Sequence, residues 1–286
     1  MTITITTSNV NGIRAAKRKG IEQWAAKNTP DVWCMQEVRA PQNEIDPIFD
    51  EFGFEYATAG RIADQSGLDR MNEICRIKGR AGVGLLSALP VIDKRYGLPG
   101  LAEDVDSGRW IEADVKTPQG YAVTVVCVYV HAGSTDDPEK MKQKYRFLDT
   151  MLVRMGQLRD EAAHGGKQAV LCGDFNIAHT PLDIKNAKAN EKHAGFLPEE
   201  RAYVDKWLGE LEFVDVMRSL CGDIQGPYTW WSQRGRAFDN NVGWRIDYQF
   251  ATPELAETAR GFVIDKAPTY DLRWSDHAPL SITYDV

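Results

Sequence analysis

The sequence lacks the features that mark membrane proteins, secreted disulfide proteins and nucleotide-loop enzymes. No apolar run approaches the ~20 residues that a membrane-spanning helix needs, so no membrane partner is expected. The first residues alternate threonine and isoleucine without a basic start, which is unlike a signal peptide and predicts a cytoplasmic location. The five cysteines are odd in number and form no C-x-x-C pair, so they predict reduced core thiols. No Gly-x-x-x-x-Gly-Lys loop is present, which argues against a P-loop enzyme.

The composition is that of an ordinary globular protein, with 43% hydrophobic and 26% charged residues. No linker rich in Gly, Ser or Pro divides the 286 residues, so we expect a single domain over 1–286. The net charge of −7 is mildly unfavourable for nucleic-acid binding. That objection is weak, because metal-binding carboxylates make a site acidic while phosphate contacts need only a local basic patch. Such patches occur at 14–19, 140–146, 185–192 and 234–236.

Hydrophobic periodicity predicts more strands than helices. Strands are expected at 2–8, 32–35, 83–87, 109–116, 121–130, 169–171, 228–232, 244–250, 261–264 and 280–284. Helices are expected after residue 12, from 138 to about 160 with Met141, Tyr145, Leu148, Leu152 and Met155 facing inward, at 199–208 and at 253–260. Residues 60–80 are expected to form a surface excursion with one helical turn near 70–77. The pattern favours two mostly antiparallel sheets packed together with helices outside.

A carboxylate and an amide follow the buried strand at 169–171. Gly173 is expected to end that strand, and Asp174 and Asn176 come directly after it. In an extended segment, residues i and i+2 point to the same side, so the two side chains would emerge together. Such a pair suits a hard cation and a phosphate. The alternative is that Asp174 only opens an Asx-type turn.

The same arrangement recurs along the chain. The predicted strand ends carry oxygen or imidazole groups at Asn9, Asn11, Glu37, Tyr129, His131, Asp174, Asn176, Asp247, Asp276 and His277. No two of these ligands have the close spacing of a zinc site. A serine triad built from Ser275 to His277 is disfavoured, since neighbours in a strand point opposite ways. The oxygen-rich set suits Mg²⁺ and phosphoryl chemistry with an activated water.

Taken in order, these motifs resemble the exonuclease III family of abasic-site (AP) endonucleases over essentially the whole chain. The resemblance is carried by Asn9 to Ala15, Gln36-Glu37, Gly173 to Ala178, Trp244 to Tyr248 and Ser275 to Pro279. The Glu, Asp-Asn and Asp-His motifs alone are shared with a wider superfamily that includes DNase I, sphingomyelinases and inositol phosphatases. Residues 186–196, similar to the family's DNA-facing segment, and 228–244, similar to its aromatic pocket for a baseless sugar, narrow the match.

The resemblance implies an α/β (α+β) fold, a four-layered α/β sandwich, and a Mg²⁺ cofactor for which Mn²⁺ substitutes. It implies metal-site roles for Glu37, Asn9, Asn11 and Asp276. It implies catalytic roles for Asp174, which activates water, Asn176, which holds a phosphate oxygen, His277, which is oriented by Asp247, and Tyr129. It implies substrate binding by Asn190, His193, Trp230, Trp244, Ile246, His131 and Arg234.

The implied activity is DNA repair: hydrolysis of the backbone 5′ to abasic sites, with 3′→5′ exonuclease and 3′-end trimming, by a monomer acting on double-stranded DNA in base excision repair. Three departures from the family concern how DNA is held, and one of them is His193, which occupies a position where animal relatives have an Asn. The loop from Tyr129 to Ser134 is shorter than in animal relatives, and Arg234 stands where those relatives place an inserted Met. A phosphodiesterase acting on a lipid or small phosphate ester stays as the alternative. No exposed apolar membrane loop, expected of the lipid hydrolases, is evident in the sequence.

Overall fold

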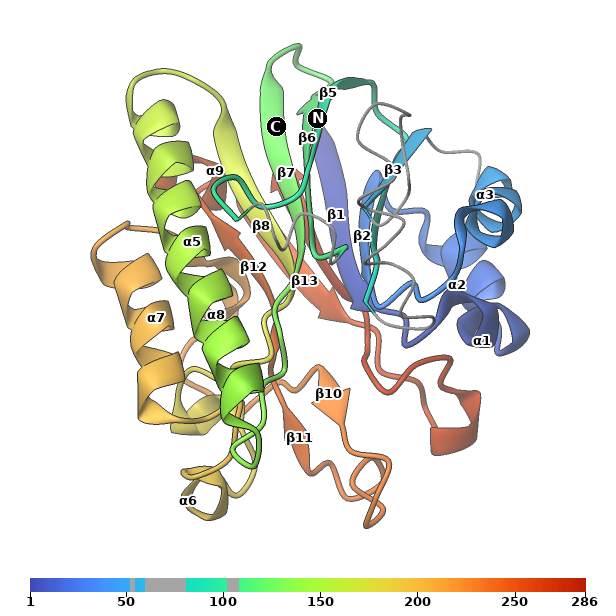
Figure 1. Ribbon diagram of the computed structural model, residues 1–286. Coiled ribbons are helices and arrows are strands. Elements are labelled where there is room, and N and C mark those ends of the chain that lie inside the picture. Colours follow the sequence, from blue (N-terminus) through green and yellow to red (C-terminus); the bar gives the residue numbers. More distant parts are fainter. Residues whose placement is uncertain (52–54, 60–80, 102–107) are drawn as a thin grey trace.

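The computed structural model describes residues 1–51, 55–59, 81–101 and 108–286. The excursion predicted at 60–80, with its helical turn, lies outside these residues. Within them, two six-stranded sheets pack face to face, and a short two-stranded sheet stands at one end (Figure 1). The two sheets and their flanking helices form the predicted α/β sandwich.

Each large sheet is mostly antiparallel, as predicted. The first has the strand order β13 (Ala259–Ile264), β14 (Leu280–Asp285), β1 (Thr2–Asn9), β2 (Val32–Gln36), β4 (Val83–Ser87) and β3 (Glu55–Ala59). The second has the order β5 (Val91–Tyr96), β6 (Trp110–Lys116), β7 (Ala122–Tyr129), β8 (Gln168–Asp174), β12 (Asp247–Ala251) and β9 (Val214–Asp215). The small sheet pairs β10 (Trp230–Trp231) with β11 (Gly243–Trp244).

One parallel pair lies at the centre of each sheet, and these pairs position the polar strand ends. Strand β1 runs parallel to β2 with Asn9 opposite Gln36, and β7 runs parallel to β8 with Tyr129 opposite Asp174. The carboxyl ends of all four strands therefore meet at one edge of the sandwich. Strand β12 is antiparallel to β8, so its first residue, Asp247, lies opposite Asp174 at the same edge.

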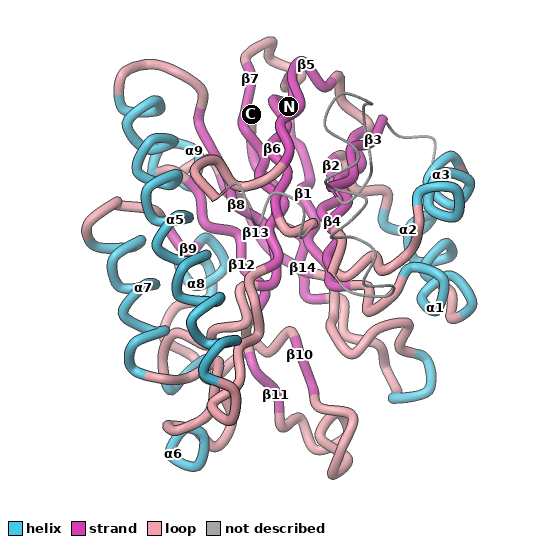
Figure 2. The backbone as a smooth tube through the Cα atoms, in the orientation of Figure 1, coloured by secondary structure: helices cyan, strands magenta, loops and turns pink. Residues whose placement is uncertain are grey.

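Alternation along the strands produces apolar layers on both faces of each sheet. On β7, Val125 and Cys127 face the core between the sheets, whereas Val126 and Val128 pack against helices. Helices α5 (Pro138–Ala163) and α7 (Pro198–Gly209) cover the outer face of the second sheet. Helices α1 (Ile13–Arg18), α2 (Ile21–Asn28) and α3 (Gln42–Asp50) cover the first sheet on the opposite side (Figure 2). The shorter helices are α6 (Ala187–Asn190), α8 (Val216–Cys221) and α9 (Pro253–Ala256), with 3₁₀ turns at Pro181–Asp183 and Tyr270–Leu272.

The predicted helix at 138–160 is confirmed, but its buried face is rotated from the prediction. Asp137 caps the helix by accepting a hydrogen bond from the backbone of Lys140, as expected for an Asp-Pro start. Phe147 and Met151 are buried, whereas the predicted Tyr145 and Leu152 are only half-buried. The cause is a lysine, Lys144, that occupies a core-facing position where the apolar pattern has a gap.

Three other boundaries were wrong. The strand predicted at 244–250 is two strands, because Arg245 and Ile246 break it, and Asp247 begins β12 rather than lying in mid-strand. The predicted helix at 253–260 stops at Ala256, because β13 pairs with β14 from Ala259 onward. Gly173 lies inside β8, where a Cβ would overlap the carbonyl of Val128, so this glycine permits a close approach and does not end the strand.

Three cysteines, Cys34, Cys127 and Cys172, are buried free thiols, as predicted, and Cys221 is free and half-buried. In the part of the chain that the structure describes, no helix is both long and apolar enough to cross a membrane.

Candidate active site

A cavity of about 430 Å³ opens at the edge where the parallel strand ends meet. Twelve of the predicted site residues line it: Asn11, Glu37, Tyr129, Asp174, Asn176, Asn190, His193, Trp230, Trp244, Ile246, Asp276 and His277. They come from segments that span most of the chain. Convergence of this many polar side chains on one concave surface is what a catalytic site requires.

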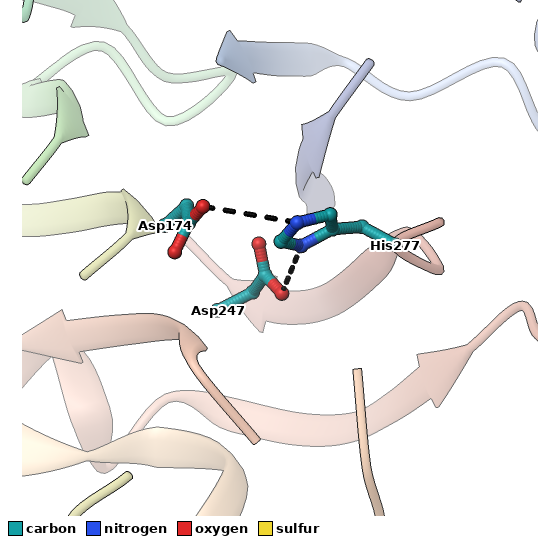
Figure 3. Close-up of side chains that lie close together, drawn as sticks. All are labelled: Asp174, Asp247 and His277. Carbon is teal, nitrogen blue, oxygen red and sulfur yellow. Dashed lines mark hydrogen bonds and ion pairs between the residues drawn. The ribbon is translucent and has the colours of Figure 1, made fainter. Parts of the chain in front are cut away.

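His277 lies between two carboxylates at the floor of the cavity (Figure 3). Its Nδ1 is 2.9 Å from Asp247 Oδ2, and its Nε2 is 3.8 Å from Asp174 Oδ2. The buried hydroxyl of Thr229 accepts a hydrogen bond from the backbone N–H of Asp247. Asp247 is fully buried behind the ring and is not part of the cavity wall, so it orients the imidazole and leaves Nε2 facing the cavity.

This cluster perturbs the pKa values of its members. Burial disfavours the charged imidazole of His277, but the Asp247 and Asp174 carboxylates outweigh it and raise the pKa of His277 to about 10. Burial raises the pKa of Asp174 to about 7, with the negative charges of Asp247 and Glu37 adding to it and the charge of His277 opposing it. An acid and a base with displaced pKa values are therefore 3.8 Å apart.

Asp174 also opens the turn that the sequence left as the alternative interpretation. Its Oδ1 accepts a hydrogen bond of 2.9 Å from the backbone N–H of Asn176. Asn176 has a left-handed backbone (φ 50°), and its side-chain amide donates to the carbonyl of Val130. One carboxylate thus serves the turn through Oδ1 and faces His277 through Oδ2.

Glu37 forms the second half of the floor. Its Oε1 accepts hydrogen bonds from the hydroxyl of Tyr129 at 2.6 Å and from the amide of Asn9 at 3.0 Å. The same Asn9 amide donates to Asp174 Oδ2 at 2.9 Å, so Asn9 is a buried bridge between the two carboxylates. Burial, together with the negative charges of Glu37 and Asp174, raises the pKa of Tyr129, so its hydroxyl stays protonated and donates.

A positive charge already occupies the space beside Glu37. The guanidinium of Arg39 contacts Glu37 Oε2 and donates to Asn11 Oδ1 at 2.8 Å. Asp276 lies next to this group and accepts hydrogen bonds from Asn11 and Trp230. The predicted metal residues therefore offer carboxylate and amide oxygens that hold a cation, and this donor set fits Mg²⁺ or Mn²⁺.

A different trio could in principle hold a metal, since ligand atoms of Asp174, Asp247 and His277 all lie within 4.8 Å of one another. A histidine binds a metal ion only in its neutral form, through a ring nitrogen that carries no proton. The raised pKa of His277 and the engagement of its Nδ1 with Asp247 make it a cationic proton donor. The trio is therefore better suited to proton transfer, and the Glu37 side of the cavity is better suited to the metal.

One wall of the cavity is aromatic. The rings of Trp230 and Trp244 meet edge to face, with centroids 6.0 Å apart, because β10 and β11 pair these two residues directly. Ile246 packs beside them. Asp276 accepts a hydrogen bond of 3.2 Å from Trp230 Nε1, which joins the aromatic wall to the polar floor.

Asn190 and His193 also line the cavity, and the segment that carries them, 185–193, has exposed lysines. We call Lys185, Lys188 and Lys192 the rim lysines; among the described residues none of them forms an ion pair. They place positive charge on the segment that carries Asn190 and His193.

Besides the buried Asn9 and Asp247, two predicted residues lie away from the cavity wall. His131 packs its ring edge to face against Phe147, with centroids 5.6 Å apart. Arg234 is exposed in the loop between β10 and β11. Their substrate-binding roles stay predictions.

Sequence reasoning missed Arg39, which lines the cavity two residues after Glu37. It also missed the buried Lys144 and its partner Glu200. For Lys144 a signal was available, because a lysine three and four residues from Met141 and Leu148 lies on the apolar face of the helix. For Arg39 the position near Glu37 was the only signal.

Comparisons with known proteins agree with this geometry. The model of the Endonuclease/Exonuclease/phosphatase family matches residues 6–277. An exodeoxyribonuclease of Bacillus subtilis is 29% identical over 97% of this chain and 98% of its own length. The structure of an AP endonuclease from Archaeoglobus fulgidus is 31% identical with a TM-score of 0.81, covering 99% of this chain and 100% of that one. A 3′ phosphatase from Neisseria, solved with a product DNA hairpin, is 26% identical with a TM-score of 0.81 and the same coverages. The chain therefore belongs to the endonuclease/exonuclease/phosphatase family, within the hydrolases that include the exodeoxyribonucleases and AP endonucleases.

Proposed function

We propose that this protein is a divalent-metal-dependent DNA repair nuclease. It hydrolyses the DNA backbone 5′ to abasic sites and trims damaged 3′ ends by 3′→5′ exonuclease action, as a monomer in base excision repair. The observation that carries the proposal is the meeting of Asp174, His277 and Glu37 on the floor of a cavity with an aromatic wall. The relatives, an exodeoxyribonuclease, an AP endonuclease and a 3′ phosphatase, support the same class of substrate.

The carboxylates and the imidazole divide the chemistry of phosphodiester hydrolysis. Asp174, with a pKa of about 7, accepts a proton from the attacking water near neutral pH. The protonated His277 donates from Nε2 to the phosphate and stabilises the charge that develops in the transition state. The amide of Asn176 lines the cavity as a further donor, and the hydroxyl of Tyr129 holds the Glu37 carboxylate in place by donating to it.

Mg²⁺, or Mn²⁺ in its place, would be held by Glu37 and Asn11 with Asp276 beside them, and it would neutralise phosphate charge. Asn9 fits this site as a brace, because its amide holds the carboxylates of Glu37 and Asp174 together. A cation here requires Arg39 to leave Glu37, which frees a guanidinium at the cavity for substrate phosphate.

The aromatic wall favours a sugar without its base. The apolar surface formed by the edge-to-face rings of Trp230 and Trp244 and by Ile246 contacts the apolar face of a deoxyribose, and a cavity of about 430 Å³ accommodates a sugar phosphate. The rim lysines contact the phosphates of the flanking duplex, which overcomes the unfavourable net charge of −7.

A duplex oligonucleotide with one stable abasic analogue tests the proposal. Incubation with Mg²⁺ should cut the strand 5′ to the lesion, and EDTA should abolish the cut. Asp174→Asn should retain DNA binding in EDTA but lose at least about a hundredfold in turnover, because it cannot accept the water proton. Asp160→Asn, an exposed carboxylate near the far end of α5, is the control and should cut normally. Inactivity on abasic and 3′-damaged DNA, beside turnover of a phospholipid or small phosphodiester, would refute the proposal.

A further inference from the structure

A lysine and a glutamate form an ion pair that is completely buried beside the cavity. Lys144 on α5 and Glu200 on α7 are both 0% exposed, and Lys144 Nζ is 2.5 Å from Glu200 Oε1. Burying such a pair is costly, and a hydrophobic pair of similar volume is often as stable. The pair therefore calls for an explanation beyond stability.

Most of the hydrogen bonds of this pair go to loops of the cavity. The ammonium of Lys144 donates to the carbonyl of Asn176 at 2.9 Å and to that of Ala132 at 3.2 Å. The ion pair with Glu200 is its third close contact. Glu200 Oε2 accepts from the backbone N–H of Gly195 at 2.6 Å, and it also caps its own helix by accepting from the backbone N–H of Leu197 at 2.9 Å.

The loops contact the pair and one another closely. A Cβ on Gly133 would lie 3.2 Å from the stem of Lys144, and one on Gly195 would lie 3.2 Å from the carbonyl of Asn176 and 3.0 Å from the ring of Trp244. Three chain segments that line the cavity, at 132–133, 176 and 193–195, are thus fixed to a single buried ion pair.

We propose that Lys144 and Glu200 are positioning residues of the nuclease, a clamp that fixes the three loops that grip the substrate strand. This inference rests on the proposed function and adds to it the residues that set the geometry of the cavity wall. The clamp supports the left-handed backbone of Asn176 (φ 50°), because the Lys144 ammonium donates a charged hydrogen bond to the carbonyl of Asn176. Burial lowers the pKa of Lys144, against the opposing charge of Glu200, so the lysine depends on its partner to stay charged.

Lys144→Met removes the three donors and keeps the shape of the stem. We expect turnover of the abasic duplex to fall by about tenfold or more per folded molecule, because a loosening of about 1 Å in a site costs up to about a hundredfold. The matched control is Glu112→Gln, which breaks a buried ion pair between β6 and Arg154 on the same helix without touching the cavity. That variant should lose stability and keep its kcat and KM.

Amide hydrogen exchange tests the clamp without relying on activity. In Lys144→Met, peptides covering 130–137 and 190–197 should exchange at least about tenfold faster than in the wild type, and in Glu112→Gln they should not. If Lys144→Met does not fold, Glu200→Gln provides the second variant, with the same direction of change and a smaller size.

The outcomes separate the two proposals. A wild-type protein inactive on abasic and 3′-damaged DNA refutes the proposed function, whereas the exchange data judge the clamp alone. Unchanged exchange in Lys144→Met, or equal losses of turnover in Lys144→Met and Glu112→Gln, would show that the pair has only a structural role and would overturn the inference.

Discussion

Asp183→Asn should destabilise the protein in a pH-dependent way, because Asp183 is a fully buried carboxylate that neutralises Arg245 beneath the cavity wall. Asp183 Oδ1 accepts from Arg245 Nε at 2.7 Å and from Arg218, and its Oδ2 accepts from the backbone and hydroxyl of Thr180. Arg245 is also fully buried and pairs with Asp215 at 2.7 Å. The substitution leaves Arg245 with one anionic partner instead of two.

The pKa of Asp183 determines how strongly the stability of the protein depends on pH. Burial works against its charge, but Arg245 and the hydrogen bonds hold its pKa at about 2, against an ordinary value of 3.8. At about 1.36 kcal/mol for each pH unit, this difference contributes about 2 kcal/mol. The folded-state pKa is depressed, so the stabilisation is present above pH 3.8 and is lost as the pH falls through about 2. Removing one partner of a buried ion pair destabilises a protein by about 3–5 kcal/mol. We expect about 3 kcal/mol for Asp183→Asn, because Asp215 still neutralises Arg245.

Urea unfolding of wild type and variant at pH 7, 5, 4, 3 and 2 measures the effect. The difference in the free energy of unfolding should be about 3 kcal/mol at pH 7 and 5 and should shrink by about 2 kcal/mol toward pH 2. Asp239→Asn, which breaks an exposed ion pair with Arg236, is the control and should change stability by less than about 1 kcal/mol at every pH. A difference for Asp183→Asn that is below about 1 kcal/mol at pH 7, or that does not vary with pH, would refute the reasoning.

Three further predictions concern the site. Arg39→Ala should tighten Mn²⁺ binding by at least about threefold, because the guanidinium no longer competes for Glu37; a titration followed by electron paramagnetic resonance measures it, and unchanged affinity contradicts it. Asp247→Asn should lower the pKa of His277 from about 10, so kcat should fall by at least about tenfold at pH 8 and by less at pH 6, and a uniform loss across the pH profile counts against this. Replacing the rim lysines by Gln should reduce the slope of log Kd against log salt concentration by up to about 3 in fluorescence anisotropy, and an unchanged slope places the DNA elsewhere.

The sequence predicted the floor of the site because the polar groups follow apolar strands. Once β1 pairs in parallel with β2, and β7 with β8, the strand order alone brings Asn9, Glu37, Tyr129 and Asp174 to one edge. Asp247 joins them because the antiparallel register places it opposite Asp174. The apolar pattern of the strands and the order of the motifs are therefore sufficient to predict which residues form the floor of the site.

The phase of helix α5 and the boundaries of the strand predicted at 244–250 were wrong for a tertiary reason. In helix α5, Lys144 occupies a buried position that the apolar pattern leaves empty. The apolar residues around it therefore predicted a buried face that includes Tyr145 and Leu152. In the 244–250 segment, the buried Arg245 must reach Asp183 and Asp215, which no local pattern indicates. Long-range charge pairing therefore overrides the strand propensity of the residues around it.

The residues that sequence reasoning missed are all charged, and no local pattern indicates their role. Lys144 and Glu200 have partners that are distant in the chain, and Arg39 has an unusual backbone conformation. Lys144 and Glu200 are 56 positions apart and meet only through helix packing. Arg39 and Glu37 both have left-handed backbones (φ 51° and 54°), a conformation that an L-residue adopts only where surrounding contacts impose it. A fully buried cation such as Lys144 offsets its desolvation cost only if it fixes something that a hydrophobic residue could not, whereas Arg39 is partly exposed at the cavity. In this fold both cations, Lys144 and Arg39, lie against the walls of the same cavity, so the strained and charged positions mark the site as clearly as the strand-end carboxylates do.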